Sequence, residues 1–220
     1  MPFIRFLFLF SATLLLSTSA ELPRILLIGD SISIGYTPFV QAHLKGRAIV
    51  EHNPGNAQHT GTGLAKLDEW IGEKDWDIIH FNWGLWDLCY RHPDSELYGH
   101  RDKVNGSLTH TVDQYKVNLD SIVTRLKKLS DAKLIFVTTT YVPPEEAGRF
   151  TADPLRYNRA AFSVMEKHGV EVNDIYAYSR EVHREHGLGP DDVHFTEAGY
   201  AALSRPLATY LEAVLAARRD

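Results

Sequence analysis

Five short apolar runs, regularly separated by stretches of helical pattern, limit the fold of this chain more than any other feature. Short apolar runs between turn formers are typical of strands that are buried on both faces, as in parallel sheets. Strands that alternate with helices indicate βαβ units, in which helices cover both faces of the sheet. We expect the strands at residues 25–28, 47–52, 77–81, 133–137 and 170–174.

The helical stretches are defined by apolar residues at helical spacing. The clearest runs from Val112 to Leu129, where Tyr115, Leu119 and Ile122 lie on one apolar stripe. We expect the other helices at residues 38–45, 63–72, 155–168, 176–186 and 196–218. The segment between residues 88 and 111 has little periodicity and many polar residues. Loops of this length inside a compact domain are usually functional or mobile.

The first twenty residues have the pattern of a secretory signal. Arg5 precedes an apolar segment at residues 6–16, and the small residues Thr18 and Ala20 suit cleavage before Glu21. The apolar segment is shorter than a comfortable transmembrane helix. We therefore predict a signal peptide at residues 1–20, a secreted or periplasmic protein, and no stable membrane insertion after cleavage. An uncleaved anchor is the alternative.

Composition narrows the class of protein further. Residues 21–220 are enough for one well-filled domain and too few for two of ordinary size. Cys89 is the only cysteine, so no internal disulfide can form. The net charge is −5 and the basic residues are scattered, which argues against a nucleic-acid partner. The eleven histidines include no His-Glu-x-x-His motif, and we expect no metal site.

A serine directly follows the first predicted strand, in the sequence Gly29-Asp30-Ser31. A serine at a sharp turn from strand to helix lies at the carboxyl end of the sheet, with backbone N–H groups around it. This is a suitable position for a nucleophile. The alternative is that Asp30 or Ser31 only caps the following helix.

A carboxylate and a histidine lie close together near the other end of the chain. Asp191 precedes His194 by three residues, between the last two predicted helices. On one turn of chain, this spacing allows the carboxylate to contact Nδ1–H while Nε2 faces outward. We expect Asp191 rather than Asp192 to make this contact, because two-residue spacing directs Asp192 away on a helical turn. Such a pair is the orienting group and the base of a catalytic triad, although it is also typical of a helix cap beside a surface histidine.

Taken together, these motifs resemble those of the SGNH/GDSL hydrolases, and the resemblance spans nearly the whole chain after residue 20. That family has Gly-Asp-Ser in its first block, a glycine in its second, Gly-x-Asn-Asp in its third and Asp-x-x-His in its last. The resemblance implies a flavodoxin-like three-layer α/β/α sandwich with a five-stranded parallel sheet. It also implies that Ser31 is the nucleophile, His194 the general base and Asp191 the orienting carboxylate, with no cofactor.

The third block departs from the family pattern. It reads Gly84-Leu85-Trp86-Asp87, so Trp86 stands where the family has the asparagine that donates to the oxyanion. An indole cannot closely replace that amide. Asn82 could turn its amide into the same space, because it lies two residues before Gly84 on an extended strand end, and Asn56 is the other candidate. Gly55 is our choice for the second-block glycine, although a plain turn would also explain it. The oxyanion donors that we expect are Ser31, Gly55, Asn82 and Asn56.

The expected cleft is rich in aromatic residues. Trp83, Trp86 and Tyr90 lie at or next to the carboxyl end of the sheet, where flat faces could line a substrate cleft together with Asp30. These features predict an exported serine esterase that acts on a small-molecule or glycan ester, and we favour acetyl groups on a carbohydrate. The alternatives are a lysophospholipase- or thioesterase-like lipid acyl hydrolase, and a catalytically impaired carbohydrate-binding protein. The sequence does not reveal the oligomeric state.

Overall fold

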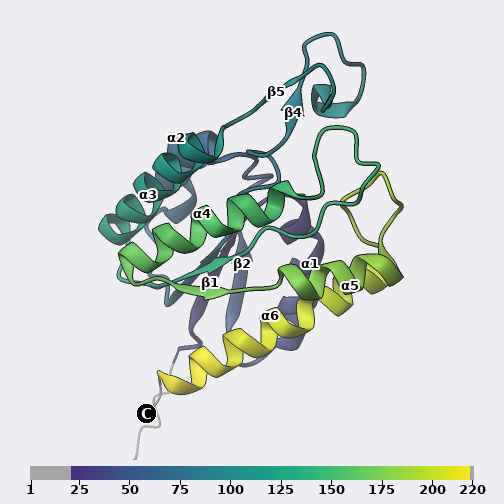
Figure 1. Cartoon of the computed structure of the whole chain (residues 1–220). Coiled ribbons are helices and arrows are strands. Elements are labelled where there is room, and N and C mark those ends of the chain that lie inside the picture. The colour runs from purple at the N-terminus through teal and green to yellow at the C-terminus, as the bar shows by residue number, and fades with distance from the viewer. Residues whose placement is uncertain (1–20, 219–220) are drawn as a thin grey trace, which may run out of the picture.

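The computed structural model describes residues 21–218 and consists of a parallel sheet between two layers of helices (Figure 1). The predicted signal segment, residues 1–20, lies outside this range. The sheet contains β1 (Arg24–Ile28), β2 (Ile49–His52), β3 (Ile78–Phe81), β6 (Lys133–Val137) and β7 (Glu171–Asn173). Their order across the sheet is β2-β1-β3-β6-β7, so the chain adds β2 on one side of β1 and the later strands on the other side. This is the flavodoxin-like order, so the predicted fold is confirmed.

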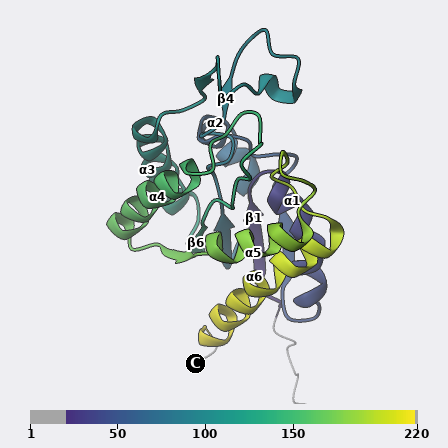
Figure 2. The ribbon, with the colours of Figure 1, turned by 45° about the vertical axis from the view of Figure 1, so that its right-hand side comes forward.

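Six helices cover the two faces of this sheet. One layer is formed by α1, α5 and α6, and the other by α2, α3 and α4 (Figures 1 and 2). The helices are α1 (Ser31–His43), α2 (Thr60–Ile71), α3 (Val112–Leu129), α4 (Asp153–His168), α5 (Tyr176–His186) and α6 (Glu197–Ala217). No helix among residues 21–218 has the length and apolar character needed to cross a bilayer.

The core lies on both faces of the sheet, as expected for parallel strands between helices. All four residues of β3 are buried, and so are the last four residues of β1. Burial of an aliphatic side chain contributes about 1.5–3 kcal/mol. Each of these strands therefore adds several kcal/mol to the frame that fixes the carboxyl ends of β1 and β3, the region where a switch-point site is expected.

The first helix begins earlier than predicted. We expected it from Pro38, but α1 begins at Ser31 and continues through Pro38. The reason is a cap: the Asp30 side chain accepts a hydrogen bond from the Ile32 N–H at 2.9 Å and so satisfies one of the free donors at the helix start. Ser31 is therefore the first residue of a helix and not part of an irregular loop.

The long segment between β3 and α3, here called the excursion (residues 88–111), extends beyond the sandwich at the top of Figure 1. It contains the short strands β4 (Tyr90–Arg91) and β5 (Ser107–Leu108), which pair antiparallel, and the 3₁₀ turn η1 (Tyr98–His100). The two ends of the excursion are joined at its base, where the buried Asp87 carboxylate lies 2.8 Å from His110 Nδ1. The predicted loop is thus an ordered ribbon.

Candidate active site

Ser31 is held at the carboxyl end of β1 by a tightly bonded turn. The Gly29 N–H donates to Asn53 Oδ1 at 2.9 Å, which ties the turn to the end of β2. A side chain at Gly29 would meet the Ser33 hydroxyl at 2.6 Å, so only glycine fits there. With Asp30 as the cap and Ser31 as the first helical residue, the serine hydroxyl is presented at the edge of the sheet.

Ser31, His194 and Asp192 form a continuous hydrogen-bonded chain. Ser31 Oγ lies 2.8 Å from His194 Nε2, although the two residues are 163 positions apart. On the other side of the ring, Nδ1 lies 2.5 Å from Asp192 Oδ1. Because a carboxylate accepts, Nδ1 carries the proton and Nε2 is free to accept the hydroxyl proton of Ser31. The predicted pairing of Ser31 with His194 is present in the structure.

The identity of the carboxylate corrects the sequence prediction. We expected Asp191 to contact His194, but Asp191 is exposed and Asp192 makes the contact. The prediction assumed a helical turn, whereas this loop is irregular. Asp192 Oδ1 also accepts the backbone N–H of His194 at 2.9 Å, and this short-range bond folds the side chain back over the residue two positions later. Two-residue spacing therefore favours the contact here.

Burial and hydrogen bonding act on the Asp192 carboxyl in opposite directions. Burial by itself would raise its pKa, but the hydrogen bonds from the backbone and ring of His194, with help from the Arg101 charge, lower the pKa below its ordinary value. Asp192 is therefore charged at neutral pH. A charged carboxylate at this distance stabilises a protonated imidazole.

The loop that carries Asp192 and His194 is fixed at several points. His183 Nε2 lies 2.7 Å from the Asp192 carbonyl oxygen, and the buried His183 ring packs edge-to-face on Phe195. The Leu188 N–H donates to the His194 carbonyl oxygen at 3.0 Å. These contacts explain how an irregular loop can hold the His194 ring within hydrogen-bond distance of Ser31, which lies at the start of α1.

A cavity of about 270 Å³ opens beside Ser31 and His194. Asp30 and Trp86 line it, as the sequence analysis predicted. Trp83 and Tyr90 do not. Trp83 is 1% exposed and its indole N–H donates to the Ala57 carbonyl oxygen, so it is a core residue. The Tyr90 ring packs edge-to-face on Phe150 outside the cavity. These two predictions were wrong because both side chains are engaged outside the cavity, Trp83 in the core and Tyr90 against Phe150.

Asn56 is the asparagine that lines the cavity. Its Oδ1 accepts the Gln58 N–H at 2.8 Å, and within residues 21–218 its Nδ2 has no acceptor. Asn82 does not line the cavity, which corrects its predicted placement: its Nδ2 donates to the Val137 carbonyl oxygen at 2.7 Å and so joins β3 to β6. Gly55 adjoins Asn56 in a left-handed conformation, with φ of 69°. Its part in an oxyanion hole stays a prediction, as does that of the Ser31 N–H.

Asp30 is almost completely buried, with 3% exposure. Burial raises the pKa of its carboxyl, while the hydrogen bond from Ile32 and the Arg149 charge act in the opposite direction. A buried carboxylate beside a nucleophile costs folding free energy. The charged form of Asp30 is therefore disfavoured by its surroundings, although the side chain caps α1.

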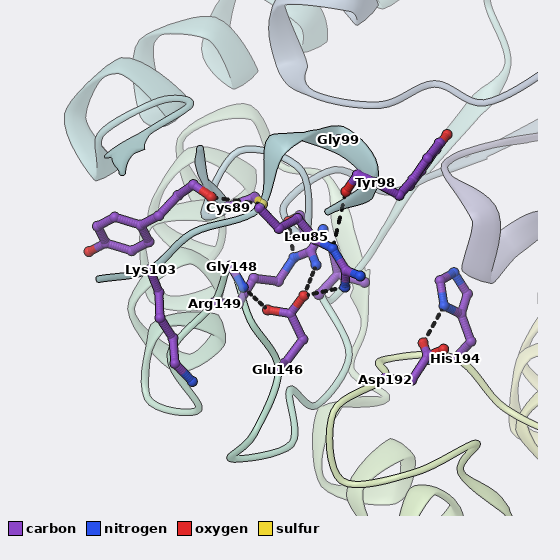
Figure 3. Close-up of polar contacts among 12 residues, drawn as sticks. Leu85, Cys89, Tyr98, Gly99, Lys103, Glu146, Gly148, Arg149, Asp192 and His194 are labelled. Carbon is purple, nitrogen blue, oxygen red and sulfur yellow. Dashed lines mark hydrogen bonds and ion pairs between the residues drawn. The ribbon is translucent and has the colours of Figure 1, made fainter. Parts of the chain in front are cut away.

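The basic wall of the cavity was not predicted from the sequence. Arg91, Arg101, Arg149 and Tyr98 also line it. The buried Glu146 carboxylate binds both Arg101 and Arg149, and Figure 3 shows Glu146 and Arg149 together, with Asp192 and His194 on the other side. The signal that could have revealed this wall is the pair of arginines inside the predicted long loop. Among the described residues, no group of three or more His, Cys, Asp or Glu side chains is arranged to hold a metal ion.

Comparison with known protein families agrees with the motifs. The profile of the GDSL-like lipase/acylhydrolase family matches residues 27–202, which include Ser31 and His194. The chain belongs to this GDSL-like family. The resemblance inferred from the first and last blocks is therefore confirmed, and membership places the chain among esterases and acylhydrolases. A search of curated proteins finds no match to the chain.

Solved structures similar to this GDSL-like protein share its fold. A catalytic mutant of an acetylxylan esterase from Geobacillus stearothermophilus has a TM-score of 0.67 at 20% identity, covering 85% of this chain and 93% of the other. The acetyl xylan esterase AlAXEase has a TM-score of 0.65 at 14% identity, covering 86% and 99%. A lipase/acylhydrolase from Enterococcus faecalis has a TM-score of 0.67 at 19% identity, covering 87% and 96%.

Proposed function

We propose that this protein is a serine esterase that removes short acyl groups, above all acetyl, from a carbohydrate. The observation that carries the proposal is the hydrogen-bonded chain Ser31–His194–Asp192, whose serine opens into a cavity of about 270 Å³. Pockets for drug-sized ligands usually measure about 300–1,000 Å³. A cavity below that range suits an acetyl group with part of one sugar better than a long acyl chain.

In the proposed reaction, Ser31 Oγ attacks the carbonyl carbon of the ester while His194 Nε2 takes the hydroxyl proton. The Asn56 amide and the Ser31 N–H donate to the oxyanion. The C–O bond to the alcohol then breaks, and Nε2 returns its proton to the leaving oxygen. Water attacks the acyl-serine by the same route, with Nε2 again as base, and releases the acid. Asp192 keeps the proton on Nδ1 and stabilises the charged ring in both steps.

Two further considerations support a carbohydrate acetate as substrate. Structures of the same fold include two proteins described as acetylxylan esterases. Trp86 and Tyr98 also line the cavity, and Tyr98 is 82% exposed. Aromatic faces of this kind are suited to the apolar face of a sugar ring.

A hydrolysis assay with 4-nitrophenyl esters of rising chain length tests the proposal. We expect the highest kcat/KM for acetate, and release of acetate from acetylated xylan. Ser31→Ala and His194→Ala should each lower kcat by at least about a thousandfold, and the double variant should lose little more than either single one, because triad members act as a unit. Circular dichroism confirms that the variants are folded. A preference for octanoate, or full activity in Ser31→Ala, would contradict the proposal.

We also propose that the protein is exported, on the basis of the signal pattern at residues 1–20. Amino-terminal sequencing of the protein purified from the culture medium or periplasm should begin at Glu21. Recovery of the intact chain from the cytoplasm would contradict export without affecting the enzymatic proposal.

A further inference from the structure

Three arginines from two separate parts of the chain line the same cavity as Ser31 and His194. Arg91 comes from β4, Arg101 follows η1, and Arg149 lies between β6 and α4. We call these three side chains the arginine wall. Figure 3 shows Arg149 and its partner Glu146 facing Asp192 and His194. The hydrogen-bond partners of the three arginines show which of their donors are free to bind a ligand.

Two of the arginines share a single carboxylate. Arg101 Nη1 and Arg149 Nη1 donate to the same oxygen, Glu146 Oε1, at 2.7 and 2.8 Å. The other oxygen, Oε2, accepts the Gly148 N–H at 2.8 Å. Glu146 is fully buried, and one negative charge therefore faces two positive charges. The remaining Nε donors of the two arginines bind carbonyl oxygens, those of Tyr98 and Leu85, which carry no net charge.

The third arginine has only neutral partners. Arg91 donates from Nε to Thr109 Oγ1 at 3.0 Å and from Nη1 to the Gly99 carbonyl oxygen. Its guanidinium carbon lies 4.7 Å from the centre of the Trp86 ring, which forms another side of the cavity. Burial lowers the pKa of Arg91, and the charges of Arg149 and Arg101 lower it too, while Cys89 and Glu146 act in the opposite direction. The three guanidinium groups are therefore close enough to repel one another.

The other carboxylates of the cavity are already engaged. Asp192 is bonded to His194, and Asp30 caps α1. Within residues 21–218, Glu146 is the only carboxylate that is hydrogen-bonded to the arginine wall, while the charges of Asp192 and Asp30 act on Arg101 and Arg149 from across the cavity. Among the hydrogen bonds within residues 21–218, none involves the Nη2 groups of Arg91, Arg101 or Arg149. Guanidinium groups with free donors are suited to the planar oxygens of a carboxylate or to the oxygens of a sulfate.

We propose that the arginine wall binds an anionic group, carboxylate or sulfate, carried by the alcohol part of the ester, so that the preferred substrate is an O-acetylated acidic sugar. This inference rests on the proposed esterase function. A cavity of about 270 Å³ lined by both Ser31 and the wall brings the ester and the charge into one sugar unit. A neutral xylan acetate would leave the free Nη2 donors of the wall without a charged acceptor.

Substrate preference in the unmodified protein gives the first test. Acetylated glucuronic acid, acetylated glucose 6-sulfate and acetylated glucose form a matched set that differs in charge. We expect kcat/KM for at least one of the two anionic esters to exceed that for the neutral ester by about tenfold or more, since a hydrogen bond to a charged group contributes about 1.5–3 kcal/mol. The better of the two identifies the anion. The preference should shrink as NaCl is added, because salt screens charges at a partly open site.

Product-like anions give a second test that needs no variant. Glucuronate or glucose 6-sulfate should competitively inhibit the hydrolysis of the neutral ester 4-nitrophenyl acetate, at an ionic strength held constant with NaCl, whereas glucose should inhibit much more weakly. Competition at constant ionic strength separates specific binding from screening.

Variants then locate the binding to the wall. Arg101→Gln leaves Arg149 on Glu146, so the buried carboxylate keeps one partner, and Arg91→Gln removes an arginine that pairs with no carboxylate. Each should reduce the ratio of anionic to neutral kcat/KM by about tenfold, and Arg101→Lys should retain part of it. The matched control is Arg125→Gln, which removes an exposed arginine paired with Asp68 on the distant α2–α3 surface and should leave the ratio unchanged.

The outcomes separate this inference from the proposed function. If esters are cleaved by a Ser31-dependent route but neither anionic ester is preferred and no anion inhibits, the wall only holds the excursion to the domain and the inference is wrong. If no ester is cleaved, but glucuronate or sulfate raises Tm in the unmodified protein and not in Arg101→Gln, the anion site stands and the esterase proposal fails.

Discussion

The two neighbouring aspartates allow a sharp test of the site, because only Asp192 contacts His194. Asp192→Ala removes the carboxylate together with the hydrogen bonds that orient the ring. The loss of such an orienting group costs about 10⁴ in kcat, or about 5 kcal/mol. Asp191→Ala removes an exposed carboxylate of the same loop and should change kcat by less than about twofold.

The variant Asp192→Asn removes the charge and also allows the amide N–H₂ to donate to Nδ1, which places the ring proton on Nε2, where it blocks proton transfer from Ser31; a change of this kind costs about 10⁴ in kcat. Two unit charges 2.5 Å apart attract by about 1.7 kcal/mol in water and by about 6.6 kcal/mol at an effective dielectric constant of about 20. The Asp192 side chain is 39% exposed, so we expect the charge alone to contribute a value between these limits, about 2–4 kcal/mol, or roughly 30- to 1,000-fold in kcat, and the tautomer to account for the rest.

The measurement is kcat for 4-nitrophenyl acetate at saturating substrate, with Tm recorded for each variant. Asp191→Ala should keep near-normal activity, whereas Asp192→Asn and Asp192→Ala should both lose about 10⁴ in kcat. A loss of several hundredfold in Asp191→Ala, together with near-normal activity in Asp192→Ala, would refute the assignment and restore the carboxylate expected from three-residue spacing.

Two further predictions concern the same site. Asn56→Asp keeps the oxygen that accepts from Gln58 but loses the free amide donor. We therefore expect kcat to fall by about 10²–10³ with little change in KM. Steady-state kinetics with Asn82→Ala as the control tests this, and a larger kcat loss in Asn82→Ala would place the oxyanion donor at the end of β3 instead. Asp30→Asn keeps the cap on Ile32 and removes a carboxyl whose pKa burial raises above 3.8. A raised folded-state pKa destabilises the fold only at pH values above the unfolded pKa. Urea denaturation should therefore show a higher free energy of unfolding for Asp30→Asn than for the unmodified protein at pH 7, and no gain below about pH 4. A lower free energy of unfolding for Asp30→Asn at both pH values would contradict a destabilising Asp30 charge.

The sheet could be predicted because its signal is local. Each strand is a short apolar run flanked by turn formers. Where such runs alternate with helical segments along a chain, a buried strand is the structure they favour. The start of α1 was missed because Gly35 and Pro38 weaken the helical pattern, while the cap by Asp30 depends on one hydrogen bond that composition does not reveal.

The side-chain details could be predicted only where chemistry restricts them. The motifs identified Ser31 and His194, and the structure joins them. The choice between Asp191 and Asp192 depended on the backbone conformation of residues 191–194. The spacing argument assumed a helical turn there, whereas the structure has an irregular loop. The arginine wall was out of reach because it is assembled from non-local contacts, such as that between Arg101 and Glu146, which are 45 positions apart.

The excursion could be replaced by another sequence during evolution without disturbing the rest of the fold. Its ends are joined at the base by Asp87 and His110, and β4 pairs with β5 just above them. A segment with adjoining ends can be exchanged for another without moving the strands and helices that hold Ser31. Because the excursion supplies Arg91, Tyr98 and Arg101 to the cavity, transplanting a different ribbon there would select a different leaving alcohol while the hydrolytic chemistry stays intact.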